Sequence, residues 1–180
     1  VAATGCARLI HAEADGFPGL TVDRYGEHLV LQATTVWADR VQATLATELL
    51  ALTRCISALS RADAKGRELE GLPLSVHPLA GEPPAALEVE EGGALRTVDL
   101  YRGHKTGLYL DQQDNHRAAS EWLHGKVLDL FCGEGGFSLP LALAGCPVTA
   151  VDQSRQGLER ADAAAARNNL SSSIEWIEGD

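Results

Sequence analysis

The sequence predicts a small α+β domain over residues 1–100, followed by the first half of an α/β Rossmann-like domain over residues 101–180. Two observations predict the second part. An apolar run at 127–130 leads through a glycine-dense turn into a helical pattern, which is typical of a buried parallel strand, a tight loop and a helix start. A second apolar run ends in Asp152, about 20 residues further on, where nucleotide-binding α/β domains place the acid that binds ribose hydroxyls.

The first hundred residues are predicted to order as strands, one helix and further strands. Alternating apolar and polar residues, separated by turn residues, predict the strands. The strands are expected at residues 7–12, 20–24, 28–34, 56–61, 86–90 and 95–99. An amphipathic helix is predicted over 37–52, because apolar residues from Trp37 to Leu52 recur at helical spacing and form an expected core stripe. Residues 62–84, with their charges, glycines and prolines, are predicted as a loop.

The second part is predicted to alternate strands and helices. Strands are expected at residues 127–130, 147–151 and 174–180, and helices at 137–144 and 153–169. Neither His104 nor His116 has a partner that can be recognised in the sequence, so no role is assigned to either.

Composition excludes several classes of protein. The net charge of −10 argues against a general nucleic-acid coat, which needs a basic surface. Four scattered cysteines and six histidines show no metal-ligand spacing, so no metal site is predicted. No apolar run is long enough to span a membrane and the start lacks signal-peptide order, so a soluble, cytoplasmic protein is expected.

The ends of the chain predict a fragment of a longer protein. The chain of 180 residues begins with Val and contains no Met, and it ends in a strand-like run. A doubly wound sheet would need more strands. An unfinished parallel sheet exposes an apolar edge, which favours self-association, with a homodimer as one outcome.

The glycine loop favours one class of nucleoside. In the frame of Gly133 and Gly135, the third position of a dinucleotide fingerprint is Ser138, so that match is incomplete. Asp129, just before the glycines, would repel a pyrophosphate but accepts hydrogen bonds from an ammonium group. A zwitterionic amino-acid nucleoside is therefore favoured. The alternatives are a nicotinamide-dependent enzyme and a non-catalytic module that binds RNA or protein through residues 1–100.

Three stretches resemble one enzyme family. Residues 129–137, Asp-Leu-Phe-Cys-Gly-Glu-Gly-Gly-Phe, look like motif I of class I S-adenosylmethionine-dependent methyltransferases. The stretch 103–115, Gly-His-Lys-Thr-Gly-Leu-Tyr-Leu-Asp-Gln-Gln-Asp-Asn, and the stretch 8–26 are similar to cytosine-C5 methyltransferases of large-subunit ribosomal RNA. That family combines a PUA domain, a central α+β domain and a Rossmann methyltransferase domain.

The resemblance implies S-adenosyl-L-methionine as cofactor and ribosomal RNA as partner. It implies a lid segment in which Tyr109 packs on the cofactor, a methionine end, a ribose-binding acid and an adenine-side acid. The implied cofactor-binding residues are Lys105, Thr106, Tyr109, Asp111 and Gln112 for the lid, Asp129, Cys132, Gly133 and Gly135 for the methionine end, Asp152 for the ribose and Asp180 for the adenine.

No catalytic residue is expected within this fragment. The family's Asn-Pro-Pro-type motif and its nucleophilic cysteine follow the adenine-side acid, and Cys132 is expected to pack rather than to attack the base. The chain is thus expected to bind the cofactor without completing catalysis. Methylation of another base or atom remains an alternative, because the part that determines specificity is absent.

Overall fold

The computed structural model describes residues 5–103 and 105–180, and the chain divides into two compact units. Unit 1 comprises Val1–Val89 and Val98–Leu110, and unit 2 comprises Glu90–Thr97 and Asp111–Asp180. The sequence predicted a single boundary at residue 100. The structure instead groups 90–97 with the second unit and 101–110 with the first, because these segments pack into those cores. His104 lies outside the described residues.

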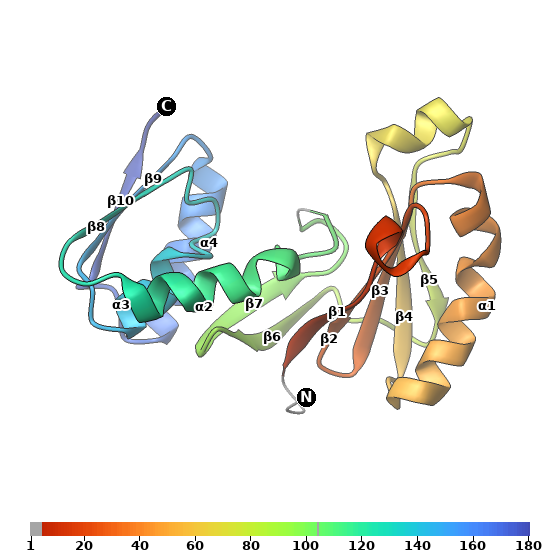
Figure 1. The fold of residues 1–180 in the computed structure, drawn as a ribbon, viewed down its shortest axis with the longest axis horizontal. Coiled ribbons are helices and arrows are strands. Elements are labelled where there is room, and N and C mark those ends of the chain that lie inside the picture. The colour runs from red at the N-terminus through yellow and green to blue at the C-terminus, as the bar shows by residue number, and fades with distance from the viewer. Residues whose placement is uncertain (1–4, 104) are drawn as a thin grey trace. The chain divides into compact units, whose positions relative to one another are not determined.

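Unit 1 is built on a five-stranded sheet with the strand order β1-β2-β3-β4-β5. The strands are β1 (Cys6–His11), β2 (Leu20–Tyr25), β3 (His28–Ala33), β4 (Ser57–Ala62) and β5 (Ser75–Ala80). Neighbours pair antiparallel except β3 and β4, which are parallel. The helix α1 (Val36–Thr53) makes the crossover between them and lies along the sheet (Figure 1).

The helix α1 buries a different stripe from the predicted one. Its buried residues are Ala38, Gln42 and Ala46, whereas Trp37 is 46% and Leu52 79% exposed. Small side chains let the helix backbone approach the sheet closely, and the larger apolar residues are left to its flanks and ends. The prediction that the stripe from Trp37 to Leu52 forms the core was therefore wrong at both ends.

The segment predicted as a loop contains regular structure. It holds the 3₁₀ turn η2 (Lys65–Glu70) and the strand β5, in which Pro78 pairs with Leu59. Because β5 is the last strand in the order of this sheet, a proline without an N–H is tolerated there. The prolines in this segment therefore masked a strand.

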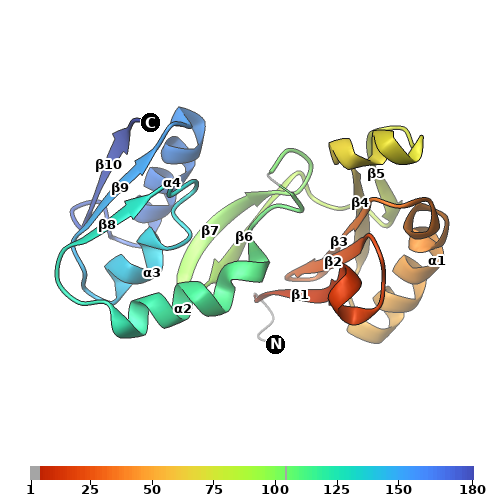
Figure 2. The same ribbon diagram turned by 45° about the horizontal axis from the view of Figure 1, so that its top comes forward.

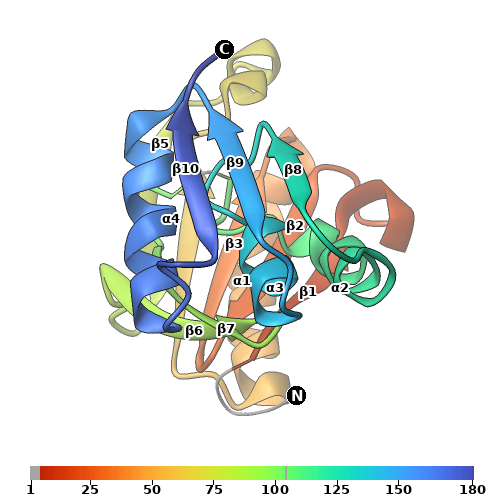
Figure 3. The ribbon, with the colours of Figure 1, turned by 90° about the vertical axis from the view of Figure 1, so that its left-hand side faces the viewer.

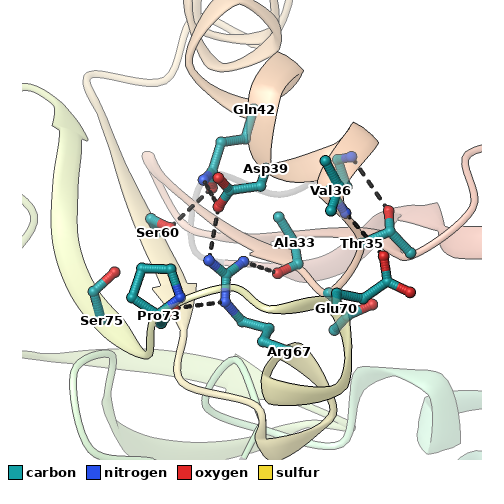
Figure 4. Close-up of polar contacts among 12 residues, drawn as sticks. Ala33, Thr35, Val36, Asp39, Gln42, Ser60, Arg67, Glu70, Pro73 and Ser75 are labelled. Atoms are coloured by element: carbon teal, nitrogen blue, oxygen red, sulfur yellow. Dashed lines mark hydrogen bonds and ion pairs between the residues drawn. The ribbon is translucent and has the colours of Figure 1, made fainter.

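Buried Arg67 of η2 joins three parts of unit 1 (Figure 4). Its Nη2 donates to Asp39 Oδ1 of α1 at 2.8 Å, and its Nε donates to the Pro73 carbonyl at 3.1 Å. Its Nη1 donates to the Ala33 carbonyl at the end of β3. The guanidinium thus connects the sheet, the helix and the segment that enters β5.

Unit 2 contains a parallel three-stranded sheet with the order β10-β9-β8 (Figure 3). Its elements are α2 (Gln113–Trp122), β8 (Val127–Leu130), α3 (Ser138–Leu143), β9 (Val148–Asp152), α4 (Arg155–Arg167) and β10 (Ile174–Glu178). The helices α3 and α4 contribute to a core that includes Val148, Ala150 and Ile174. The opposite face presents exposed Leu128 and Leu130. The sequence had not predicted α2, which follows the short 3₁₀ turn η3 (Leu110–Gln112).

The strands β6 (Ala86–Glu91) and β7 (Ala94–Asp99) form a two-stranded hairpin (Figure 2). Its residues divide between the two units, with Glu90–Thr97 in unit 2. Gly92 and Gly93 at its turn have φ of 59° and 84°, the left-handed values that a tight two-residue hairpin turn requires. Within unit 2, the Leu95 N–H donates to Asn168 Oδ1 at 2.9 Å, and Asn168 Nδ2 donates back to the Leu95 carbonyl at 2.8 Å. The tip of the hairpin is therefore held at the end of α4.

Within the described ranges, none of the helices has the length and apolar character needed to cross a membrane.

Candidate functional site

A tight loop connects β8 to α3 and forms the centre of the candidate site. Phe131, Gly133 and Gly135 have φ of 61°, 57° and 78°, so the backbone turns sharply three times. A Cβ on Gly135 would come within 3.0 Å of the Trp176 ring, whereas a Cβ on Gly133 would meet no heavy atom within 4 Å. One side of the loop is thus packed, and the side at Gly133 is open to a ligand. We call residues 131–137 the glycine loop.

Asp152 connects three segments at the carboxyl end of the sheet. Its Oδ2 accepts from the Gly133 N–H and its Oδ1 from the Ser154 N–H, both at 2.8 Å. Its backbone carbonyl accepts from the Gly179 N–H at 3.1 Å. Because parallel strands end at the same edge, the acid predicted from its spacing comes to lie directly beside the glycine loop.

Asp129 in β8 is a partly buried carboxylate that accepts a hydrogen bond from a side chain. Ser138 Oγ donates to its Oδ2 at 2.6 Å. Burial raises the pKa of the Asp129 carboxyl above its ordinary value of 3.8, and the hydrogen bonds from Ser138 only partly offset that effect. Ser138 is fully buried and occupies the position of the third small residue in a dinucleotide fingerprint. Here its hydroxyl instead donates a hydrogen bond to Asp129.

Cys132 is buried in the glycine loop between the two acids. Burial, followed by the charges of Asp129 and Asp152, raises the pKa of its thiol to about 12. Only a thiolate acts as a nucleophile, so this cysteine is unreactive near neutral pH. The structure agrees with a packing role rather than a catalytic one.

We expect Cys132 to be alkylated by iodoacetamide at least about 100-fold more slowly in the folded chain than in urea at pH about 8, because its thiolate is scarce and covered. Peptide mapping by mass spectrometry measures the rate, and the same peptide in urea is the control. Folding raises the pKa of the Cys132 thiol, so the protonated thiol stabilises the folded state. This contribution is complete below pH about 9.0, the ordinary thiol pKa, and is lost as the pH rises through about 12. Rapid alkylation of the native chain would contradict this assignment.

Three further predicted residues also lie in unit 2. Asp111 is half-buried in η3. Gln112 precedes α2, and its Oε1 accepts from Asn115 Nδ2 at 2.9 Å. Asp180 is exposed and follows Gly179, whose N–H donates to Asp152. The backbone thus brings Asp180 to the sheet edge at which Asp152 lies.

The other predicted lid residues belong to unit 1. Tyr109 is 47% exposed, and Lys105 Nζ lies 4.5 Å from the centre of its ring. Lys105 also lines a pocket of about 280 Å³ within unit 1. Thr106, by contrast, is completely buried: its hydroxyl donates to Asp23 and lies 3.3 Å from the Tyr25 hydroxyl. These contacts engage the Thr106 side-chain hydroxyl within unit 1, and contact of Thr106 with a cofactor stays a prediction.

The sequence analysis missed three buried residues beneath the glycine loop, which are Glu91, Arg96 and His116. Arg96 pairs with Glu91 at 2.6 Å, and His116 Nδ1 lies 3.5 Å from Glu91 Oε1. The alternating pattern of the hairpin could have predicted that Glu91 and Arg96 are buried, because they lie on the same side of their strands as buried Val89 and Val98. Nothing comparable in the sequence pointed to His116.

Part of this site lies within a stretch that matches a known protein family. A family model described as a methyltransferase domain matches residues 127–180, which include the glycine loop, Asp152 and Asp180. A provisionally assigned SAM-dependent methyltransferase from Streptococcus mutans has the same fold, with a TM-score of 0.82 and 22% identity over 100% of this chain and 47% of that one. A second methyltransferase structure, complexed with SAH, matches with the same TM-score, identity and coverage. Residues 127–180 thus match a methyltransferase-domain model, and the chain shares its fold with these solved structures.

The curated relatives include ribosomal RNA large subunit methyltransferase I of Escherichia coli K12. That protein is 40% identical over 177 residues, which cover 96% of this chain and 45% of the relative. The chain therefore spans less than half the length of the curated relative that it matches.

Proposed function

We propose that this chain is the cofactor-binding part of an S-adenosylmethionine-dependent methyltransferase that acts on large-subunit ribosomal RNA. The observation that carries the proposal is the joint placement of the open glycine loop, Asp152 and Asp129 at one end of a parallel sheet. The methyltransferase family match and the SAH-bound structural neighbour support the cofactor. The Escherichia coli relative supports the RNA substrate.

Each part of the proposed site serves a different part of the cofactor. The partly buried Asp129 carboxylate would accept hydrogen bonds from the ammonium group, and Cys132, Gly133 and Gly135 would line the methionine end. Asp152 would hold the ribose hydroxyls and Asp180 the adenine edge. Asp111 and Gln112 would add hydrogen bonds, and Lys105 and Tyr109 remain proposed lid residues. When bound, the cofactor supplies an electrophilic methyl group on its sulfonium.

Carbon 5 of a cytosine is the proposed methyl acceptor. That carbon is a weak nucleophile, so the reaction needs a thiolate that adds to carbon 6 and a base that later removes the carbon-5 proton. The raised pKa of Cys132 argues that it does not supply the thiolate. The proposal therefore assigns the nucleophile and the target-base contacts to other parts of the whole protein.

A nicotinamide dinucleotide is the main alternative ligand. The partly buried Asp129 argues against it, because this acid precedes the loop where a pyrophosphate would lie. A non-catalytic binding module is also disfavoured, since Asp129, Gly133 and Asp152 all retain the arrangement that a nucleoside site needs.

Calorimetric titration tests the proposed cofactor. S-adenosylmethionine or S-adenosylhomocysteine is expected to bind the chain with one-site stoichiometry, and NAD is expected not to bind. Circular dichroism first establishes that the chain is folded. Saturable binding of NAD with no binding of either sulfur nucleoside would overturn the proposal.

The affinity for S-adenosylmethionine is expected to fall as pH is lowered from about 7 toward the ordinary carboxyl value of 3.8, because the ammonium group needs ionised Asp129. Folding without ligand raises the pKa of the Asp129 carboxyl, so its protonated form stabilises the folded state. This contribution is complete below pH 3.8, the ordinary carboxyl pKa, and declines as the pH rises through the pKa of the folded chain. Binding should therefore release a proton in this window. Titrations in buffers of different ionisation enthalpy measure that release.

The variant Asp129→Asn provides the control for this pH dependence. It keeps a polar side chain beside Ser138 but has no carboxyl proton to lose. Its affinity should be lower than that of the wild type at pH about 7 and nearly constant across the window. An unchanged pH profile in this variant would assign the dependence to another group.

A further inference from the structure

A buried charged cluster lies under the glycine loop, and nothing in the proposed function uses it. We propose that Glu91, Arg96 and His116 are positioning residues that hold the glycine loop in its binding conformation. The inference rests on the proposed function for the ligand, but it makes a separate statement about the loop. All three residues, and the loop itself, belong to unit 2.

Arg96 connects the hairpin to the loop backbone. Its Nη1 lies 2.6 Å from Glu91 Oε2, and its Nη2 donates to the Glu134 carbonyl at 2.9 Å. Both side chains of the ion pair are almost completely buried, at 7% and 3% exposed. A planar guanidinium can serve a carboxylate and a carbonyl at once, which a lysine ammonium on the same stem does less well. The carbonyl that it holds lies between Gly133 and Gly135.

The side chain of Glu134 is held from the opposite direction. Its Oε1 pairs with Arg160 Nη2 of α4 at 2.8 Å. Glu134 is therefore fixed through its backbone by the hairpin and through its side chain by the helix that follows β9. This restrains the middle of the glycine loop between two elements.

His116 fills the space beneath the end of the loop. Its ring packs edge-on against Phe137, with ring centres 4.5 Å apart and planes at 77°. A Cβ on Gly136 would lie 2.8 Å from the ring carbon Cε1 and 2.9 Å from Nε2. Unlike Gly133 and Gly135, Gly136 does not have a positive φ. The glycine at this position is therefore explained by the histidine ring, not by backbone conformation.

Glu91 links the two contacts. Its Oε1 lies 3.5 Å from His116 Nδ1, and each of these buried atoms lacks a hydrogen-bond partner among the described residues. Burial alone would raise the pKa of Glu91, but the interaction with His116 and the charge of Arg96 outweigh it and hold the pKa below its ordinary value. The carboxylate is thus ionised between the two side chains that touch the loop. Removing one member of such a group leaves buried charge uncompensated.

The hairpin also contacts unit 2 through residues outside the charged cluster. A variant of the cluster can therefore disturb the glycine loop without releasing the hairpin. Ala94 is part of the unit 2 core, and Leu95 exchanges two hydrogen bonds with Asn168. The hydrogen bonds between Leu95 and Asn168 do not involve the glycine loop. Loss of the Arg96 or His116 contacts should therefore loosen the loop more than it loosens the hairpin.

Hydrogen exchange of the ligand-free chain tests the inference without reference to any ligand. In Arg96→Met and His116→Gln, peptides that cover residues 132–137 should exchange at least about tenfold faster, while peptides of β9 and α4 keep wild-type protection. Arg96→Lys should restore the loop only in part. Arg117→Gln is the matched control, since exposed Arg117 follows His116 on α2 and pairs with the surface acids Asp114 and Glu121 of the same helix. Wild-type exchange at 132–137 in the folded variants would overturn the inference.

Calorimetry then relates the loop to the ligand. Arg96→Met and His116→Gln should bind S-adenosylhomocysteine at least about tenfold more weakly than the wild type and Arg117→Gln. If the wild type binds no sulfur nucleoside, the proposed function fails, and the exchange data alone decide the inference. If the wild type binds and the folded variants bind equally well, the inference fails and the proposed function stands.

A double-mutant cycle covers the case in which Arg96→Met unfolds. Gly136→Ala should weaken binding by about tenfold, because its new methyl group meets the His116 ring. In a His116→Ala background the ring is absent, so the same substitution should change the binding free energy by at most about a third of its effect in the wild type. Additive effects would show that His116 and Gly136 do not act together and would overturn the inference.

Discussion

Asp152→Ala is expected to lower the affinity of this chain for S-adenosylmethionine by at least about 100-fold, which corresponds to about 2.7 kcal/mol. The carboxylate has two functions that the substitution removes together. It accepts hydrogen bonds from Gly133 N–H and Ser154 N–H at 2.8 Å, and it is the proposed acceptor for the ribose hydroxyls. A hydrogen bond to a charged group contributes about 1.5–3 kcal/mol, so the loss of ribose contacts and of loop order accounts for the expected effect.

Two further variants separate these functions. Asp152→Asn retains one carbonyl oxygen for the Gly133 N–H but loses the charge and the second acceptor, so an intermediate affinity is expected. Asp162→Ala removes an exposed carboxylate from the adjacent helix α4 and should bind like the wild type. Calorimetry measures all three affinities after circular dichroism has shown that each variant is folded. Equal affinities of Asp152→Ala and the wild type would remove Asp152 from the proposed site.

Arg67→Ala is expected to reduce the free energy of unfolding of unit 1 by about 3–5 kcal/mol. The guanidinium is nearly inaccessible to solvent and donates to Asp39, to the Pro73 carbonyl and to the Ala33 carbonyl. Figure 4 shows these partners converging on it from the sheet, from α1 and from the segment before β5. The substitution removes the Arg67 donor from two carbonyls and from Asp39, which keeps only the weaker hydrogen bond from Gln42 at 3.2 Å, and it opens a cavity as well.

The measurement must report on unit 1 alone. Urea denaturation followed by hydrogen exchange of β3, β4 and α1 peptides meets that need, because all three elements belong to this unit. Arg40→Ala is the matched control, since Arg40 lies on the exposed face of α1 and its loss should cost less than about 0.5 kcal/mol. A loss of stability below about 1 kcal/mol in Arg67→Ala would show that the buried contacts contribute little.

Much of the fold followed from local patterns in the sequence. Alternation predicted β1, β2 and β3, and the glycine-dense stretch between apolar runs predicted β8, the loop and α3. Helical spacing predicted that α1 exists, yet it selected Trp37 and Leu52 for a core that instead uses Ala38, Gln42 and Ala46. The existence of a helix depends on its own residues, whereas its buried face depends on how closely the sheet approaches.

Apart from α2, the features that the sequence did not predict depend on distant partners. The strand β5 contains Pro78 and lies in a segment rich in charge, so only its pairing with β4 makes it a strand. Arg67, in the same segment, had the appearance of a solvated charge until Asp39 and two carbonyls enclosed it. Local composition could not distinguish either case from a loop, because the stabilising contacts come from residues far away in the chain.

Local sequence patterns were enough to locate the candidate site. Asp129, the glycines and Asp152 could be recognised from their spacing, because a parallel strand, a tight turn and the next strand impose a fixed separation on them. Only the tertiary structure decided which side chains support these residues. It committed Thr106 to the core of unit 1, gave Ser138 to Asp129, and brought Glu91, Arg96 and His116 beneath the glycine loop. The physical reason is that buried polar groups must find partners wherever the fold provides them, and those partners are rarely neighbours in the sequence.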